Sequence, residues 1–284
     1  MAVKIGFNLL AWMANISEDV FPLVDRLHSI GYDGIETPME NRDLDLYRRF
    51  ARHVHDRGME VTMVLALGDD ENPIDPSPEV RQKGIDRIKW GIDQAQEMGS
   101  KVIGGPFHSA FAKFTGVPAT EQELEWSIEA LSAVGPYAAA ADVVMCIEAL
   151  NRFECYLCNT MAQAVSMVNK VNHPNIQVMF DTHHANMEEK NFRQAIEHVA
   201  PVLGHVHISE NDRGTPGDGN VPWDETFATL ADVGYDGWLT IEGFTRHNTD
   251  FANAINVWRE FSPPWDMAER GHQFIKSMCE KHGL

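Results

Sequence analysis

Cysteine and long apolar segments are both scarce in this sequence, and each scarcity argues against a class of protein. The 284 residues contain four cysteines, too few to predict a disulfide framework in a chain of this length. The most apolar stretch, residues 130–147, is interrupted by Ser132, Gly135, Pro136 and Asp142, which argues against a membrane span. The amino-terminal stretch also lacks the apolar core of a signal peptide. We therefore expect a cytoplasmic protein with no membrane partner.

Positive charge is scarce as well. Lysine and arginine number 23 against 42 aspartates and glutamates, which gives a formal net charge of -19. A surface this negative repels the phosphates of nucleic acids. Nucleic acid is therefore not an expected partner.

What the sequence does contain is a repeated alternation of short apolar runs and helical patterns. The apolar runs, which predict strands, cover residues 4–10, 34–36, 60–66, 101–104, 143–148, 176–181, 203–208 and 238–242. The helical patterns cover residues 18–30, 44–57, 78–98, 120–140, 160–171, 188–199, 223–233 and 267–281. Eight strand–helix units in this order predict an α/β fold, the (β/α)₈ TIM barrel, whose usual length is about 250 residues.

The sequence offers no point at which to divide the chain. A linker rich in proline, glycine or serine is not found between any two units. We therefore predict that residues 1–284 form one barrel domain. Its active site is expected at the carboxyl ends of the strands, where barrel enzymes place their catalytic residues.

Four metal-binding residue types stand at or near the ends of four consecutive predicted strands. They are Glu148, Asp181, His207 and Glu242. The carboxyl ends of barrel strands converge on one mouth, so these side chains are expected to meet. Three carboxylates in one pocket repel one another unless a cation lies between them. An oxygen-rich set with one nitrogen suits Mn²⁺, Mg²⁺ or Co²⁺.

Each of these residues also has a purely structural interpretation. An acidic residue at the end of a strand often caps the following helix or forms a turn. His205 lies on the same face of its strand as His207, one layer deeper, and we interpret it as a core histidine bonded to a neighbour.

The spacing Cys155-x-x-Cys158 raises a different possibility, a zinc knuckle or a redox pair. A zinc site would need a second such pair or a nearby histidine ligand, and the sequence around it offers neither. The carboxylates are therefore the favoured carriers of chemistry in this stretch.

Four motifs in the second half of the sequence resemble a known family. "EALNRFE" with Asn159, "FDTHH", "HVHISENDRG" and "IEGF" are similar to the ketose 3-epimerases, which act on sugars such as D-tagatose, D-allulose and L-ribulose. These enzymes belong to the xylose isomerase-like TIM barrel superfamily. The resemblance covers nearly the whole chain, and Cys155 and Cys158 fill positions that the pattern leaves open.

The resemblance implies roles for particular residues. It implies that Glu148, Asp181, His207 and Glu242 bind a divalent metal, with Mn²⁺ as the first choice and Co²⁺ or Mg²⁺ as alternatives. It implies that Glu148 and Glu242 are also the acid and the base. The residues that it implies for substrate binding are Glu154, His184, Arg213, Trp12, Phe7 and His108. A homodimer or homotetramer and a monosaccharide substrate are further expectations.

C3 epimerisation explains why such a site needs two carboxyl groups. A proton leaves the carbon beside the C2 carbonyl, a cis-enediolate forms, and a proton returns from the opposite face. One carboxyl must be ionised to take the proton and the other protonated to supply one. Arg213 could polarise O2 or hold O1 and O3, although it could also be a solvated charge or a partner of Asp212 or Asp218.

Several other functions remain open at this point. An aldose–ketose isomerase, a hydroxypyruvate isomerase or an inosose dehydratase of the same superfamily would share most of the four ligands. An apurinic endonuclease on this barrel would need a histidine-rich trinuclear zinc site and a basic groove, which the net charge of -19 disfavours. A non-catalytic sugar or metal binder would not need both Glu148 and Glu242.

Overall fold

Eight parallel strands form a closed barrel in the computed structural model, which describes residues 3–39 and 43–284. Each strand pairs with the next one in the chain, and β8 pairs with β1. The strands are β1 (Lys4–Asn8), β2 (Gly34–Pro38), β3 (Glu60–Val64), β4 (Val102–Gly105), β5 (Val144–Glu148), β6 (Ile176–Asp181), β7 (Leu203–Ile208) and β8 (Trp238–Ile241). The predicted (β/α)₈ fold is confirmed.

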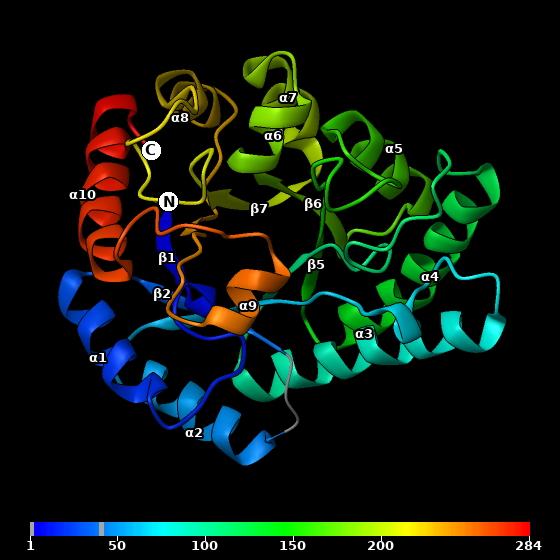
Figure 1. The fold of residues 1–284 in the computed structure, drawn as a ribbon, viewed down its shortest axis with the longest axis horizontal. Coiled ribbons are helices and arrows are strands. Elements are labelled where there is room, and N and C mark those ends of the chain that lie inside the picture. The colour runs from blue at the N-terminus through cyan, green and yellow to red at the C-terminus, as the bar shows by residue number, and fades with distance from the viewer. Residues whose placement is uncertain (1–2, 40–42) are drawn as a thin grey trace.

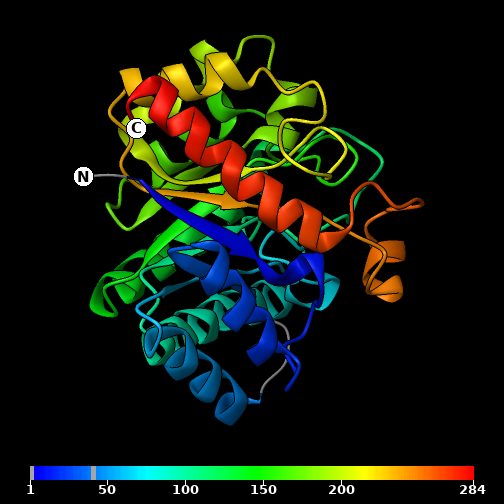
Figure 2. The same ribbon diagram turned by 90° about the vertical axis from the view of Figure 1, so that its left-hand side faces the viewer.

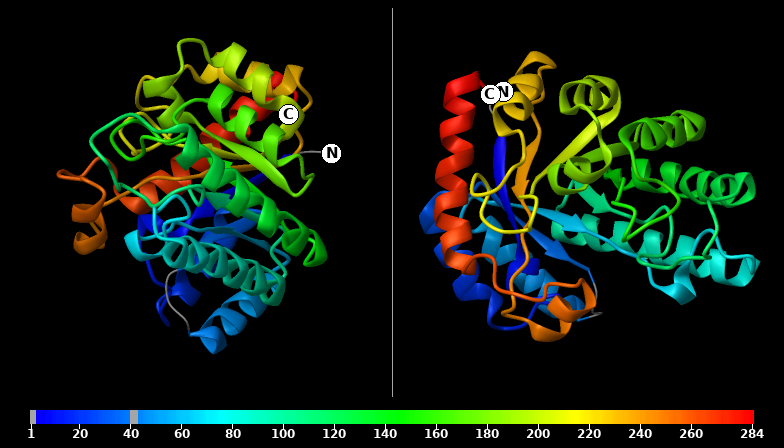
Figure 3. Two further views of the ribbon diagram at one scale, coloured as in Figure 1. Left: turned by 90° about the vertical axis from the view of Figure 1, so that its right-hand side faces the viewer. Right: turned by 45° about the horizontal axis from the view of Figure 1, so that its top comes forward.

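Helices surround this barrel (Figure 1). They are α1 (Val20–Ile30), α2 (Leu44–His55), α3 (Pro78–Met98), α4 (Glu121–Ala140), α5 (Met161–Val171), α6 (Thr182–Glu188), α7 (Phe192–Val199), α8 (Trp223–Asp232), α9 (Thr249–Ala254) and α10 (Pro264–His282). Figure 2 shows α9 on the side toward which β1 points, away from the two termini, and Figure 3 gives two further views. Across the described residues, every helix is too short or too polar to span a bilayer.

Two segments differ from the sequence prediction because polar side chains cap short helices. The predicted helix 188–199 corresponds to α7, which begins only at Phe192, and α6 directly after β6 was not predicted. Asp181 accepts a hydrogen bond from the backbone N–H of His184 and so starts α6 directly after β6. Asn191 caps α7 in the same way. The short helix α9, capped by Asn248, has no counterpart among the predicted elements.

The barrel interior contains a buried layer of polar side chains. Asn8, Glu36 and Thr62 are register partners on β1, β2 and β3, so they form one inward-facing layer. All three are buried. Apolar residues of the strands and of the inner helix faces form the core around the barrel. This polar layer therefore differs from the apolar core that surrounds the barrel.

Glycine at position 34 makes room for one bulky core residue. A Cβ atom on Gly34 would lie 2.4 Å from the ring of Trp238 on β8. Strand β1 is only five residues long and runs between β2 and β8. The indole reaches across it only because position 34 carries no side chain.

We expect Thr120→Ala to destabilise the fold by about 1 kcal/mol, because it removes an N-cap. The hydroxyl of Thr120 accepts a hydrogen bond from the N–H of Glu123 at 3.2 Å, and the Glu123 carboxylate accepts one from the Thr120 N–H at 2.7 Å. This is the capping box predicted from the sequence. Urea denaturation measures the change. Thr120→Ser keeps the hydroxyl and should be close to wild type, and equal loss in both variants would contradict the capping role.

Candidate active site and metal centre

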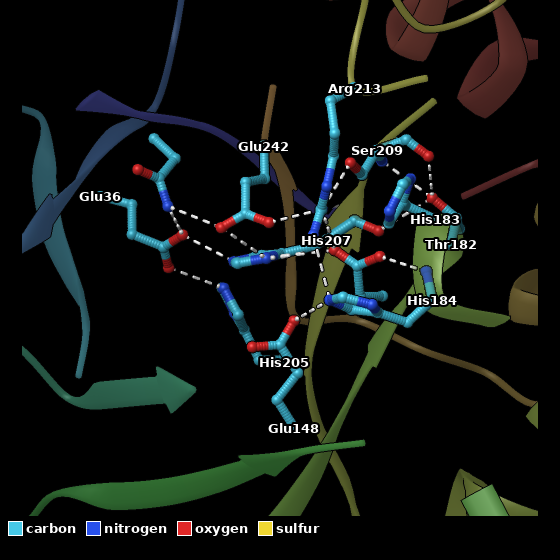
Figure 4. A network of polar contacts seen from close by, with 12 residues as sticks. Glu36, Glu148, Thr182, His183, His184, His205, His207, Ser209, Arg213 and Glu242 are labelled. Atoms are coloured by element: carbon cyan, nitrogen blue, oxygen red, sulfur yellow. Dashed lines mark hydrogen bonds and ion pairs between the residues drawn. The ribbon is translucent and has the colours of Figure 1, made fainter. Parts of the chain in front are cut away.

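The structure brings together the four side chains that the sequence singled out. Glu148 and Asp181 are the last residues of β5 and β6, His207 is the penultimate residue of β7, and Glu242 directly follows β8. One ligand atom from each lies within 4.8 Å of the other three. All four side chains are buried, and Figure 4 shows three of them, Glu148, His207 and Glu242, around one point.

Two atoms of this cluster indicate that it suits a cation. Oε1 of Glu148 and Nδ1 of His207 are buried without a hydrogen-bond partner. His207 Nδ1 lies 3.6 Å from Asp181 Oδ2 and 3.5 Å from Glu242 Oε1. Buried polar atoms are normally satisfied, so unpaired acceptors facing two carboxylates point to a positive ligand. Three carboxylates and one imidazole nitrogen are donors that a divalent metal accepts.

Arg213 lies against the same carboxylates. Its Nη1 donates to Glu242 Oε2 at 2.7 Å, to Asp181 Oδ2 at 3.2 Å and to Ser209 Oγ at 2.9 Å. Its backbone is in the left-handed region, with φ of 66°, which is rare for a residue other than glycine. Burial lowers the pKa of Arg213, but the charges of Asp181 and Glu242 outweigh it and raise the pKa above its usual value.

The interpretation of Arg213 as a solvated charge is therefore wrong. Its guanidinium is buried and paired with Asp181 and Glu242, while Asp218 pairs with Arg270.

Asn151 forms hydrogen bonds with both His184 and Glu154. The N–H of Asn151 donates to His184 Nδ1 at 3.0 Å, and its side-chain amide donates to Glu154 Oε1 at 3.0 Å. His184 Nε2 then lies 3.4 Å from Glu148 Oε1 and 3.0 Å from Arg213 Nη2. Asn151 thus fixes two of the predicted substrate-binding residues beside the carboxylate cluster.

The environment shifts the pKa values of two carboxyl groups of the cluster in opposite directions. Burial raises the pKa of Glu148, and the charges of Glu242 and Asp181 add to that increase against the opposing effect of His184. Burial also acts to raise the pKa of Asp181, but Arg213 and His184 outweigh it and hold that pKa well below its usual value. The two neighbouring carboxyl groups therefore differ in pKa although both are buried.

A cavity of about 390 Å³ opens above these residues. Glu148, Glu154, His184, Arg213 and Glu242 form its polar end. Most of its remaining wall is apolar and comes from the ends of the first five strands, the loops after them, the loop after β8 and the region of α9, namely Leu10, Ala14, Pro38, Val64, Leu65, Ala66, Gly105, Pro106, Phe111, Leu150, Phe244, Phe251, Ala254 and Ile255. Its size, and its few convergent polar groups within a mostly apolar wall, are typical of a small-molecule site.

Comparison with known proteins identifies the family. Residues 24–278 match the family described as "Xylose isomerase-like TIM barrel". The D-psicose 3-epimerase of Ruminiclostridium cellulolyticum is 30% identical over 264 residues, which cover 92% of this chain and 90% of that protein. The chain belongs to this family, as one of its ketose 3-epimerases. It is therefore a carbohydrate isomerase by family.

Two more ketose 3-epimerases agree with this assignment. The L-ribulose 3-epimerase of Mesorhizobium japonicum is 28% identical over 277 residues, which cover 96% of this chain and 93% of that protein. The crystal structure of D-allulose 3-epimerase from Methylomonas sp. in complex with D-allulose has a TM-score of 0.92 and 26% identity, and the match covers 98% of this chain and 97% of that one.

Three residues that the sequence predicts to contact substrate are buried and do not line the cavity. Phe7 and Trp12 are buried and pack on each other with ring centroids 5.0 Å apart. His108 is also buried, and its Nε2 lies 2.8 Å from the backbone carbonyl oxygen of Glu148. Burial lowers the pKa of His108 to about 4. None of the three is among the residues that line the cavity in the described part of the chain, so contact between them and the substrate stays a prediction from the sequence.

The cysteines do not form part of this epimerase site. All four are buried free thiols, and burial raises the pKa of Cys158 above its usual value. The groups of possible metal ligands found among the described residues contain only histidine, aspartate and glutamate. The zinc-knuckle interpretation of Cys155 and Cys158 thus finds no support.

Sequence reasoning missed one buried acidic residue of this ketose 3-epimerase, Glu36. Its Oε1 lies 2.7 Å from Nε2 of His207 (Figure 4). The signal that found the other carboxylates was present here too, because Glu36 ends the predicted strand 34–36.

Proposed function

We propose that this chain epimerises free ketoses at C3 through a cis-enediolate. The observation that carries the proposal is the meeting of Glu148 and Glu242, from strands that are not neighbours, within one ligand cluster beside the cavity. Two carboxyl groups that can reach the same carbon from different strands are what proton removal and return on opposite faces require.

The two glutamates divide the proton transfers between them. One carboxylate takes the C3 proton and the other carboxyl returns a proton to the opposite face, with the roles reversed for the other epimer. Both glutamates line the cavity, which supports access of both carboxyl groups to a bound sugar.

The proposed cofactor is a divalent cation, Mn²⁺ in the first place and Co²⁺ or Mg²⁺ as alternatives. Its proposed ligands are Glu148, Asp181, His207 and Glu242. When bound, such an ion supplies a Lewis acid that stabilises negative charge on the substrate oxygens. Arg213, His184 and Glu154 are proposed to hold the O1 to O3 end of the sugar, because all three line the polar end of the cavity.

An uncharged sugar suits this cavity better than a sugar phosphate. Arg213 is the only arginine or lysine among the described lining residues, and Asp181 and Glu242 already balance its charge. Phosphate recognition would need further cationic or backbone donors. The proposed substrates are D-tagatose, D-allulose and D-fructose, and L-ribulose, and relatives solved with D-allulose, D-fructose and D-tagatose support this choice.

Solvent isotope exchange tests the proposed reaction. Each ketose is incubated with the enzyme and Mn²⁺ in D₂O, and its C3 epimer and the deuterium at C3 are followed by chromatography and NMR. We expect deuterium at C3 of the epimer from at least one ketose. Isomerisation to an aldose, turnover of hydroxypyruvate alone, or loss of water from an inosose would indicate the alternative members of the superfamily. A sugar binder would give no exchange.

The location, the domain organisation and the assembly of the enzyme remain proposals. We propose a cytoplasmic protein that acts as one barrel domain in a homodimer or homotetramer. Cell fractionation and light scattering of the purified protein test these points.

A further inference from the structure

Glu36 is a fully buried carboxylate directly beside the proposed metal ligands. Each of its oxygens has two neighbours that can donate a hydrogen bond. Oε1 lies 2.7 Å from His207 Nε2 and 3.0 Å from Asn8 Nδ2. Oε2 lies 2.9 Å from His205 Nε2 and 3.1 Å from Thr62 Oγ1. Figure 4 shows Glu36 on the side of His207 that faces away from Arg213.

This arrangement determines which nitrogen of His207 carries a hydrogen. A carboxylate surrounded by four donors acts only as an acceptor, so His207 must donate through Nε2. In a neutral imidazole the other nitrogen then has a free lone pair. That nitrogen is Nδ1, the buried unpartnered atom that faces Asp181 and Glu242.

Asn8 extends the same contact to a second ligand. Its Nδ2 donates to Glu36 Oε1 at 3.0 Å and lies 3.4 Å from Glu242 Oε1. The amide cannot turn over freely, because its oxygen accepts a hydrogen bond from the N–H of Leu10 at 2.9 Å. One carboxylate on β2 therefore constrains ligands on β7 and after β8.

His205 contacts the other oxygen of Glu36. Its Nε2 lies 2.9 Å from Glu36 Oε2, while its Nδ1 is buried without a partner, so Glu36 is the one hydrogen-bond partner of its imidazole among the described residues. The ring lies close to β4 at a glycine: a Cβ atom on Gly104 would approach His205 Cδ2 to 3.5 Å and Met179 Sδ to 2.9 Å. The glycine leaves this layer of the barrel open for the imidazole.

We propose that Glu36 is a positioning residue that fixes Nδ1 of His207 as its metal-coordinating atom and, through Asn8, orients Glu242. The inference rests on the proposed metal-dependent function. Carboxylates that bond to a ligating histidine fix its ring and raise its basicity, and their loss typically weakens metal binding 10–100-fold. Glu36 has no direct access to the substrate, since it is not among the described residues that line the cavity.

Glu36→Gln tests this role through metal binding. A glutamine amide accepts through one atom only, so its NH₂ group would oppose the N–H of His205 or His207. Titration of the metal-free proteins with Mn²⁺ by calorimetry should show a dissociation constant about 10–100-fold higher than in wild type. The visible absorption bands of the Co²⁺ form should shift, because the orientation of the His207 ligand changes.

Ile35→Ala is the matched control. Ile35 precedes Glu36 on β2, is equally buried and faces the apolar core on the other side of the strand. This variant should lose stability, yet keep the wild-type Mn²⁺ affinity and Co²⁺ spectrum. A loss of metal affinity that followed stability alone would appear in both variants and would overturn the positioning role.

The remaining outcomes separate this inference from the proposed function. If wild type binds neither Mn²⁺ nor Co²⁺, the metal-dependent function fails. If wild type binds metal and Glu36→Gln binds it equally with an unchanged Co²⁺ spectrum, only the role of Glu36 fails. Should Glu36→Gln not fold by circular dichroism, Glu36→Asp replaces it. This variant keeps the charge but withdraws the carboxylate from His207, and wild-type affinity in it would likewise overturn the proposal.

Discussion

Replacement of either Glu148 or Glu242 by glutamine is expected to lower kcat for C3 epimerisation by at least about 10³-fold. General acid–base catalysis alone typically contributes about 10²–10⁴-fold, and each of these residues is also a proposed metal ligand. Glutamine keeps the size of the side chain but cannot take up a proton. Turnover of each ketose, measured by chromatography with saturating Mn²⁺, gives the change in kcat.

The same two variants should differ in which epimer they can label. In each variant the remaining carboxylate still faces one side of C3. It could remove that proton and return a deuteron to the same face, which gives exchange without inversion. We therefore expect Glu148→Gln to label C3 of one epimer in D₂O and Glu242→Gln to label C3 of the other. Near-normal epimerisation by either variant would contradict the scheme with two carboxyl groups.

Glu188→Gln provides a control for the loss of a buried carboxylate near the site. The Glu188 side chain is 6% exposed, pairs with Arg152 at the surface and does not line the catalytic cavity. Its turnover should stay close to wild type. A large loss in this variant would indicate that the effects at positions 148 and 242 arise from general disruption of the fold.

Removal of metal is the second change with a large expected effect. Chelation by EDTA should abolish turnover, and Mn²⁺ or Co²⁺ should restore it, because Glu148, Asp181 and Glu242 converge with a buried unpaired Nδ1 of His207. The ion should also stabilise the fold, because it binds the native cluster and not the unfolded chain. At a metal concentration 100 times the dissociation constant this stabilisation is about 2.7 kcal/mol.

Activity and thermal melting, each measured before chelation, after it and after addition of metal, test this expectation. Metal content by atomic emission confirms that the treated protein is free of metal. Asp181→Asn is a useful companion variant, because it removes a proposed ligand without removing either proposed acid or base. It should require more Mn²⁺ for the same melting temperature. Full activity in verified metal-free enzyme would refute the metal role.

The fold and the four proposed ligands could be predicted from the sequence because both follow from strand periodicity. The ends of parallel strands meet at one rim of a barrel, so residues at positions such as 148, 181 and 242 converge wherever the strands close. The position of Arg213 could not be obtained in this way. Its guanidinium reaches the carboxylates from an irregular loop with a left-handed backbone, and no periodicity describes such a loop.

The residues that line the cavity could likewise not be predicted from the sequence. Aromatic residues near strand ends are equally compatible with a binding surface and with a core, and Phe7 and Trp12 prove to be core. Phe251 and Ile255 belong to the wall, since α9 brings them over the mouth of the barrel. Which aromatic side chain faces a cavity depends on how distant elements pack, and local patterns do not record this.

By itself, the sequence determined an eight-unit barrel and the convergence of carboxylates and an imidazole on its rim, because hydrophobic period and strand ends are local properties of the chain. The tertiary structure alone decided how those groups are held. The register of β1, β2 and β3 aligns Asn8, Glu36 and Thr62, and closure of the barrel brings that layer against His207. Hydrogen bonds between residues 171 positions apart in the chain exist only once the strands have closed.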